Sequence, residues 1–202
     1  MILRLLALVG LVTLAGCAAN SLDETPEALG DFRLGYNIVQ ARDVEQGPFS
    51  REATKDELTT ALADAVEARL GRYDGDGLYH LGIAIGGYVL ALPGLPVIYT
   101  PKSALIFEVN VYDNATQQRL NAKPHRITAF EGVENIAPIV GSGLVRGKEE
   151  QLENLATDGA RALENWLIRN AEWFTPEPGQ TRVEFDRDAL DAQAQAAIAA
   201  RP

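Results

Sequence analysis

Four segments of the chain carry the hydrophobic spacing of a β-strand. Apolar residues take alternate positions in 32–38, 78–86, 105–111 and 127–129. Successive side chains of a strand point to opposite faces of a sheet, so this spacing predicts four strands that each bury one face. In the first strand we expect one face to hold Phe32, Leu34, Tyr36 and Ile38.

Two longer segments carry the spacing of an amphipathic helix. Thr54 and Glu57 form a capping box at the start of the first helix, and Gly71 is placed to end it. The apolar stripe of this helix is Leu58, Leu62, Val66 and Leu70. The stripe of the second helix is Leu152, Leu155, Ala156, Gly159, Leu163, Trp166 and Leu167. A glycine within that second stripe predicts close packing of the helix on a sheet.

The order of these elements is a strand, a helix, three strands and a helix. It predicts an α+β fold with a mainly antiparallel sheet of about four strands and both amphipathic helices packed on one face. We expect a single domain at 32–174. A C-terminal extension follows at 175–202, and its alanine content permits a helix without a strong apolar face.

The first sixteen residues have one positive charge, Arg4, then an uninterrupted apolar core and small residues, which is the pattern of a signal peptide (1–16). The sequence Leu-Ala-Gly-Cys that ends at Cys17 resembles the lipobox of bacterial lipoproteins. Membership of that family implies diacylglycerol on the thiol, cleavage before Cys17 and acylation of the new amino terminus. Cys17 is the only cysteine in the chain, so no disulfide competes for it.

This resemblance implies a membrane partner for the mature protein. Two or three acyl chains on Cys17 hold a protein firmly to a bilayer, since each buried methylene contributes about 0.8 kcal/mol. In the lipoproteins of Gram-negative bacteria an aspartate after the cysteine retains the protein at the inner membrane, and here that residue is Ala18. We therefore expect 17–31 to be a lipidated tether at the inner leaflet of the outer membrane, with the body facing the periplasm.

Charge and composition narrow the function further. Removing the signal leaves 186 residues with a formal net charge of −11, because Arg4 goes with it. A net negative body without clustered Lys and Arg argues against nucleic-acid binding. The run 141–148 departs from the P-loop spacing at Ser142 and Glu149, and His80 and His125 lack partners at metal-ligand spacing. We expect no enzyme, no cofactor and no metal site.

An uncharged apolar stretch, 88–101, lies in the middle of this acidic chain. The uncharged window extends over 77–101, and its prolines and glycines exclude a transmembrane helix, so 88–101 is predicted to be a long connection between two strands. In one interpretation its side chains complete the core; in the other they form an exposed apolar patch that contacts a protein or a membrane. The patch residues are Tyr88, Val89, Leu90, Leu92, Leu95, Val97, Ile98 and Tyr99.

In element order and size, residues 32–173 resemble the small α+β units of outer-membrane lipoproteins, among them the curli-secretion type and the amino-terminal domain of the Tol-system β-propeller protein. No diagnostic motif carries this resemblance, so it implies no functional residue. The leading hypothesis is a lipid-anchored binding or assembly component that engages an envelope protein or its own copies. The alternative is a carrier or chaperone for an apolar ligand such as a lipid.

Overall fold

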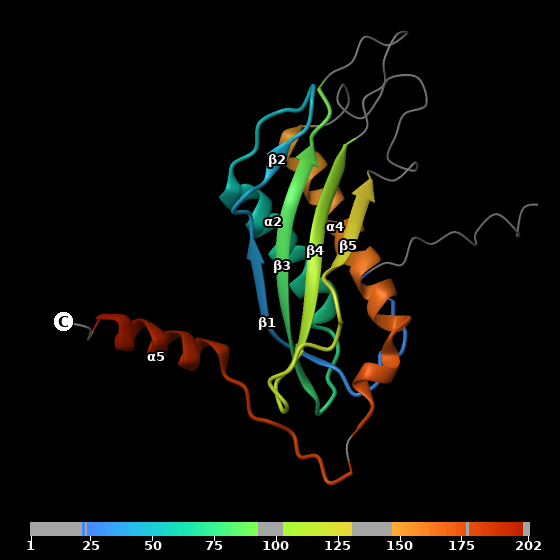
Figure 1. Ribbon diagram of the computed structural model, residues 1–202, viewed down its shortest axis with the longest axis vertical. Helices are drawn as coiled ribbons and strands as arrows, with labels where there is room; N and C mark the ends of the chain where they lie inside the picture. The colour runs from blue at the N-terminus through green and yellow to red at the C-terminus, as the bar shows by residue number, and fades with distance from the viewer. Residues whose placement is uncertain (1–21, 23, 93–102, 131–146, 177, 200–202) are drawn as a thin grey trace, which may run out of the picture.

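A sheet with two helices on one face forms the body of the protein, so the predicted α+β class is confirmed (Figure 1). The computed structural model describes residues 22, 24–92, 103–130, 147–176 and 178–199. The core lies between the helices and the sheet and includes the fully buried Phe32, Phe107 and Phe174.

The sheet is mixed, with strand order β1-β3-β4-β5 and with the short β2 also pairing to β3. Its strands are β1 (Arg33–Gln40), β2 (Glu45–Gln46), β3 (Leu78–Val89), β4 (Ala104–Asp113) and β5 (His125–Phe130). The pairs β3–β4 and β4–β5 are antiparallel, whereas β1 and β2 run parallel to β3. The parallel pairs and β2 were not anticipated; helix α2 (Lys55–Leu70) carries the chain back between β1 and β3, which makes parallel pairing possible.

Helix α2 begins as predicted. The Thr54 hydroxyl accepts a hydrogen bond from the Glu57 amide at 3.2 Å, and the Glu57 carboxylate accepts one from the Thr54 amide at 2.7 Å. The helix ends at Leu70 with Gly71 as its cap. All four residues of its predicted stripe are buried.

Helix α4 (Lys148–Ile168) buries all seven residues of its predicted stripe. A methyl group on Gly159 would lie 3.0 Å from the Phe107 ring and 3.6 Å from Ala129, which confirms the close packing predicted there. Lys148 pairs with Glu57 at the starts of the two helices, and Glu164 pairs with Arg69 near their ends. The helices α2 and α4 therefore run in the same direction.

The expected alternation of β1 is wrong beyond Leu34. Its register against β3 shifts between Leu34 and Asn37, and this bulge turns Ile38 outward, where 52% of its surface is exposed. The His80 imidazole fills the bulge, and its Nδ1 accepts a hydrogen bond from the Tyr36 amide at 2.8 Å. A methyl group on Gly35 would lie 2.3 Å from that nitrogen, so only glycine leaves room for the ring.

After α4 the chain forms the 3-10 helix η2 (Ala171–Phe174) and then an extended segment that passes along β1. Phe185 packs edge-on against Tyr36 at 5.2 Å, and Arg187 pairs with Glu67 of α2 at 3.1 Å. Helix α5 (Arg187–Ala199) then projects away from the body (Figure 1). Within the ranges that the structure describes, no helix combines the length and the hydropathy needed to cross a bilayer.

Candidate functional site

The structure places Tyr88 and Leu90 of the apolar stretch in the core, so for these two residues the first interpretation holds and the exposed-patch hypothesis is wrong. Tyr88 is 6% exposed, and its hydroxyl accepts a hydrogen bond from the Ala53 amide at 3.1 Å. Leu90 is fully buried, and its amide donates to the Ser50 hydroxyl at 2.8 Å. Tyr88 lies at the end of β3 and Leu90 directly follows that strand, and the Tyr88 hydroxyl contacts the chain just before α2.

The rest of the predicted patch is divided. Val89 is half-buried, and Leu92 has 40% of its surface exposed. The residues Leu95, Val97, Ile98 and Tyr99 lie outside the described part of the chain, as does the predicted lipidation residue Cys17.

A different surface is available on the face of the sheet opposite the helices. No helix among the described residues covers this open face (Figure 1). It exposes large apolar side chains near its edges, with 52% of Ile38 and 58% of Phe130 accessible, while the central strand β3 presents small residues. Those small residues are Gly82, Ala84 and Gly86. A central strand of small residues between larger neighbours forms a groove.

Two adjoining hollows, of about 540 and 340 Å³, lie on the open face where β3 ends and β4 begins. They share Asp43, Gly86, Ile106 and Arg126, and together we name them the open-face trough. A methyl group on Gly86 would meet nothing closer than the Ile106 carbonyl oxygen at 4.0 Å, so the floor at this point is free space. Other residues that line the trough are Gln40, Arg42, Glu45, Gln46, Gly47, Pro48, Ala84, Ile85, Gly87, Tyr88, Val89, Ala104, Phe107 and Glu108.

The rim of the open-face trough carries both signs of charge. Arg126 of β5 reaches Glu108 of β4 at 3.2 Å, and Asp43 and Glu45 line the opposite side. The floor is made of glycine, alanine and the half-buried Ile106. This combination suits a ligand that presents an apolar group with polar groups beside it.

One sequence signal could have predicted the floor of the open-face trough. Gly82, Ala84 and Gly86 alternate with the buried Leu81, Ile83 and Ile85, so the side chains on the outward face of β3 are unusually small. The second contribution, from residues 42–48 beside β3, follows from the pairing of β2 and has no local sequence signal.

Both histidines make structural contacts. The Nε2 of His80 lies 3.0 Å from the Asn114 amide oxygen, so with Nδ1 accepting from the Tyr36 amide, Nε2 is the nitrogen placed to donate. His125 stacks on Trp166 with the ring centres 4.2 Å apart, and burial, helped by the nearby Arg169, lowers its pKa. Among the described residues no group of three His, Cys, Asp or Glu side chains is placed to hold a metal ion.

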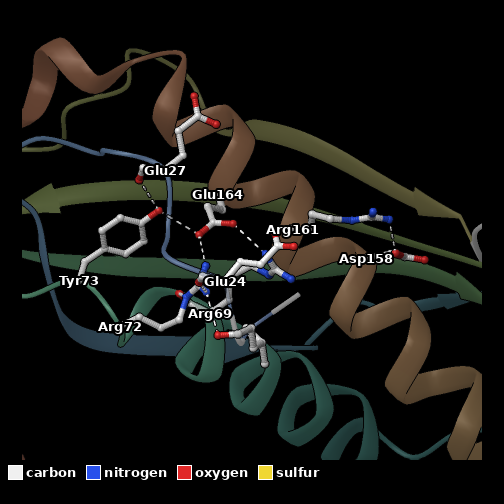
Figure 2. A network of polar contacts seen from close by, with 9 residues as sticks. Glu24, Glu27, Arg69, Arg72, Tyr73, Asp158, Arg161 and Glu164 are labelled. Atoms are coloured by element: carbon white, nitrogen blue, oxygen red, sulfur yellow. Dashed lines mark hydrogen bonds and ion pairs between the residues drawn. The ribbon is translucent and has the colours of Figure 1, made fainter. Parts of the chain in front are cut away.

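Among the described residues, a buried polar cluster is centred on Glu164 of α4 (Figure 2). Its carboxylate accepts hydrogen bonds from Arg69 at 2.8 Å and from Arg72 at 2.9 Å, and the Tyr73 hydroxyl lies 2.9 Å from it. Burial alone would raise the pKa of Glu164, but these three partners outweigh it and lower the pKa. Burial beside this carboxylate also raises the pKa of Tyr73. Glu164 is 1% exposed, and with its pKa lowered it is ionised near neutral pH. Its ion pairs with Arg69 and Arg72 link α4 to the end of α2.

No protein-family model and no curated protein sequence matches this chain. Solved structures with a related outline include a Xanthomonas campestris protein of family DUF330, with 15% identity, TM-score 0.44, and coverage of 74% of this chain and 92% of that one. A Chlamydia trachomatis protein has 9% identity, TM-score 0.37, and coverage of 68% and 99%. A minor lipoprotein from Acinetobacter baumannii has 17% identity, TM-score 0.29, and coverage of 65% and 94%. Likeness at this level assigns no function and no residue role.

Proposed function

We propose that this protein is a lipid-anchored envelope lipoprotein that faces the periplasm and acts, without catalysis, as a binding or assembly component. Lipidation of Cys17 attaches it to the inner leaflet of the outer membrane, in keeping with Ala18 at the next position. The open face of the sheet, and within it the open-face trough, is the surface that engages the partner.

The observation that supports this proposal is the uncovered sheet face. A sheet that packs helices on one side normally turns a polar side to water, yet this one exposes Ile38, Tyr112 and Phe130 there. Exposed apolar groups gathered on one face mark interaction sites.

The occupant that fits the open-face trough best is a polypeptide segment of another envelope protein. A polypeptide places apolar side chains next to backbone amides and charges, which matches a floor of Gly86 and Ile106 between Arg126 and Glu45. An acyl chain has no polar groups along its length to pair with this rim. The trough is also open to water, since Ala84 and Gly86 are exposed, whereas ligand pockets bury most of a small molecule.

The proposal is tested in two steps. Intact mass spectrometry of the membrane fraction should show loss of residues 1–16 and added acyl mass, and Cys17→Ala should abolish both. A photoreactive amino acid at Ile106 should then cross-link one envelope protein in living cells, while the same group at Thr60, on the exposed side of α2, should not.

A pair of glycine variants controls this experiment. Gly86→Val fills the trough floor and should remove the cross-link. Gly82→Ala adds a methyl group on the same strand in ordinary contact with Tyr112 at 3.5 Å, so it should leave the cross-link in place. A cross-linked or co-purifying lipid would instead support the carrier function, and equal cross-linking from Ile106 and Thr60 would count against the open face as the binding surface.

A further inference from the structure

The chain next to the predicted lipid attachment is fastened to the body by one arginine. Arg72 donates from Nη1 to the carbonyl oxygens of Leu22 at 3.2 Å and Glu24 at 3.1 Å. Its Nη2 donates to Glu164 at 2.9 Å and its Nε to the Arg69 carbonyl oxygen at 2.9 Å. All three guanidinium nitrogens are therefore used, and only 14% of the side chain is exposed.

Further contacts continue this attachment along the chain. The Tyr73 hydroxyl lies 3.0 Å from the Glu27 carbonyl oxygen, Leu29 is 1% exposed, and the Asp31 amide donates to the Phe174 carbonyl oxygen at 2.7 Å. The chain is thus attached to the body at Leu22, Glu24 and Glu27, ahead of the start of β1. Figure 2 shows Glu24 and Glu27 beside Arg72, Tyr73 and Glu164.

The first attachment point limits how far the body can stand from its anchor. Leu22 is five Cα–Cα steps from Cys17, with four residues between them. A fully extended chain spans at most about 3.3–3.6 Å per step, so this tether reaches no more than about 18 Å. Without the Arg72 contacts the first attachment would be Glu27, ten steps from Cys17, and the reach would be about 35 Å.

The attachment also fixes the side from which the tether leaves. Arg72 follows α2, and Glu164 belongs to α4, and both helices lie on the same face of the sheet. The first attachment point therefore lies at the helix layer, near the C-terminal ends of α2 and α4. A helix with its side chains is about 10–12 Å in diameter.

We propose that the Arg72 clamp orients the anchored protein, so that the layer of α2 and α4 faces the lipid surface and the open face of the sheet points away from it. The clamp consists of Arg72 with the carbonyl oxygens of Leu22 and Glu24. This inference rests on the proposed lipidation of Cys17. It gives the short tether a role, because a tether of about 18 Å cannot pass around a helix layer and a sheet to let the open face approach its own membrane. The open-face trough is then presented to partners on the periplasmic side.

The experiment uses the full-length protein purified from membranes and reconstituted in vesicles of phosphatidylethanolamine and phosphatidylglycerol. Lipidation consumes the only thiol of the chain, so a single introduced cysteine takes up a maleimide spin label selectively. Ala28→Cys places the label on the exposed part of the N-terminal segment, and Ala84→Cys places it on the open face. Nickel chelated on lipid headgroups then relaxes labels that lie near the membrane.

We expect the label at residue 28 to be relaxed at least threefold more strongly than the label at residue 84. Arg72→Ala should lower that ratio to near one, whereas Arg161→Ala, which removes the arginine that pairs with Asp158 on the same helix, should preserve it. If Arg72→Ala does not fold by circular dichroism, Arg72→Lys, which keeps the charge but cannot donate to both carbonyl groups and Glu164 together, replaces it.

The outcomes separate this inference from the proposed function. Labelling of the unmodified protein by maleimide would show a free Cys17 thiol, and the lipoprotein function itself would then fail. A lipidated protein with equal relaxation at residues 28 and 84 would overturn the orientation. A difference that survives Arg72→Ala in a folded protein would show that Arg72 does not set it.

Discussion

Replacing Glu164 by glutamine tests whether the buried cluster holds the helix layer together. The substitution keeps the size of the side chain but removes the charge that faces Arg69 and Arg72, whose side chains are 3% and 14% exposed. Breaking a buried ion pair by removing one partner costs about 3–5 kcal/mol, because the remaining charge is left without compensation. Domains of this size have a total stability of roughly 5–15 kcal/mol, so we expect a large fraction of it to be lost.

The assay is urea unfolding of the body, residues 18–202, followed by circular dichroism at pH 7. For a domain of this size, each kcal/mol of lost stability lowers Tm by about 2–4 °C. A loss of about 3–5 kcal/mol should therefore lower Tm by roughly 6–20 °C in a thermal unfolding experiment. Arg161→Ala is the matched control, since it removes a partly exposed pair on the same helix and should cost about 1 kcal/mol or less.

The pH dependence adds a second readout. The folded-state pKa of Glu164 is lowered, so its stabilising effect is present above the pKa of about 4.3 for an unfolded glutamate and is lost as the pH falls through the lowered value. Glutamine does not titrate, so the difference between the two proteins should shrink as the pH falls below about 4.3 and through the lowered folded-state pKa. A Glu164→Gln protein within about 0.5 kcal/mol of the parent at pH 7 would refute a stabilising role for the cluster, since that is the range of ordinary surface changes.

Three further predictions concern the core and the helix starts. Leu90→Ala should destabilise the fold by about 2–5 kcal/mol in urea unfolding, whereas Leu92→Ala at the exposed neighbour should cost about 0.5 kcal/mol or less; equal effects would contradict the assignment of Leu90 to the core. The hydrogen bond from Lys148 is the main cause that lowers the pKa of Glu57 to about 2, so an NMR titration should find this value, and Lys148→Ala should raise it. The Lys148–Glu57 contact stabilises above the ordinary glutamate pKa and is lost as the pH falls toward 2. Gly159→Val should cost about 1–3 kcal/mol by forcing Phe107 aside, and an unchanged Tm would show that the helix and sheet pack less closely than described.

The local elements were predictable because their signals are local. Thr54 and Glu57 reveal the start of α2 through a contact that spans four residues, and the stripes of α2 and α4 follow from helical periodicity alone. The same holds for the buried faces of β3 and β4, since period two needs no knowledge of the neighbouring strand. These features gave the α+β class before any pairing was known.

The bulge in β1 shows where such reasoning stops. Alternation places Ile38 on the same face as Leu34, but the register shift reverses the faces between them. The shift depends on the His80 ring, which arrives from β3 and bonds the Tyr36 amide. No pattern within 32–40 contains that distant side chain.

The resemblance to a lipobox at Cys17 and the strand and helix periods can be read from the sequence by itself, because each depends only on residues that are neighbours along the chain. The tertiary structure alone decided that Tyr88 and Leu90 are core residues, that the open face of the sheet carries the trough, and that Arg72 binds the chain at Leu22 and Glu24. Each of these depends on which segments meet in space, and an apolar run such as 88–92 looks the same in sequence whether a helix covers it or water does.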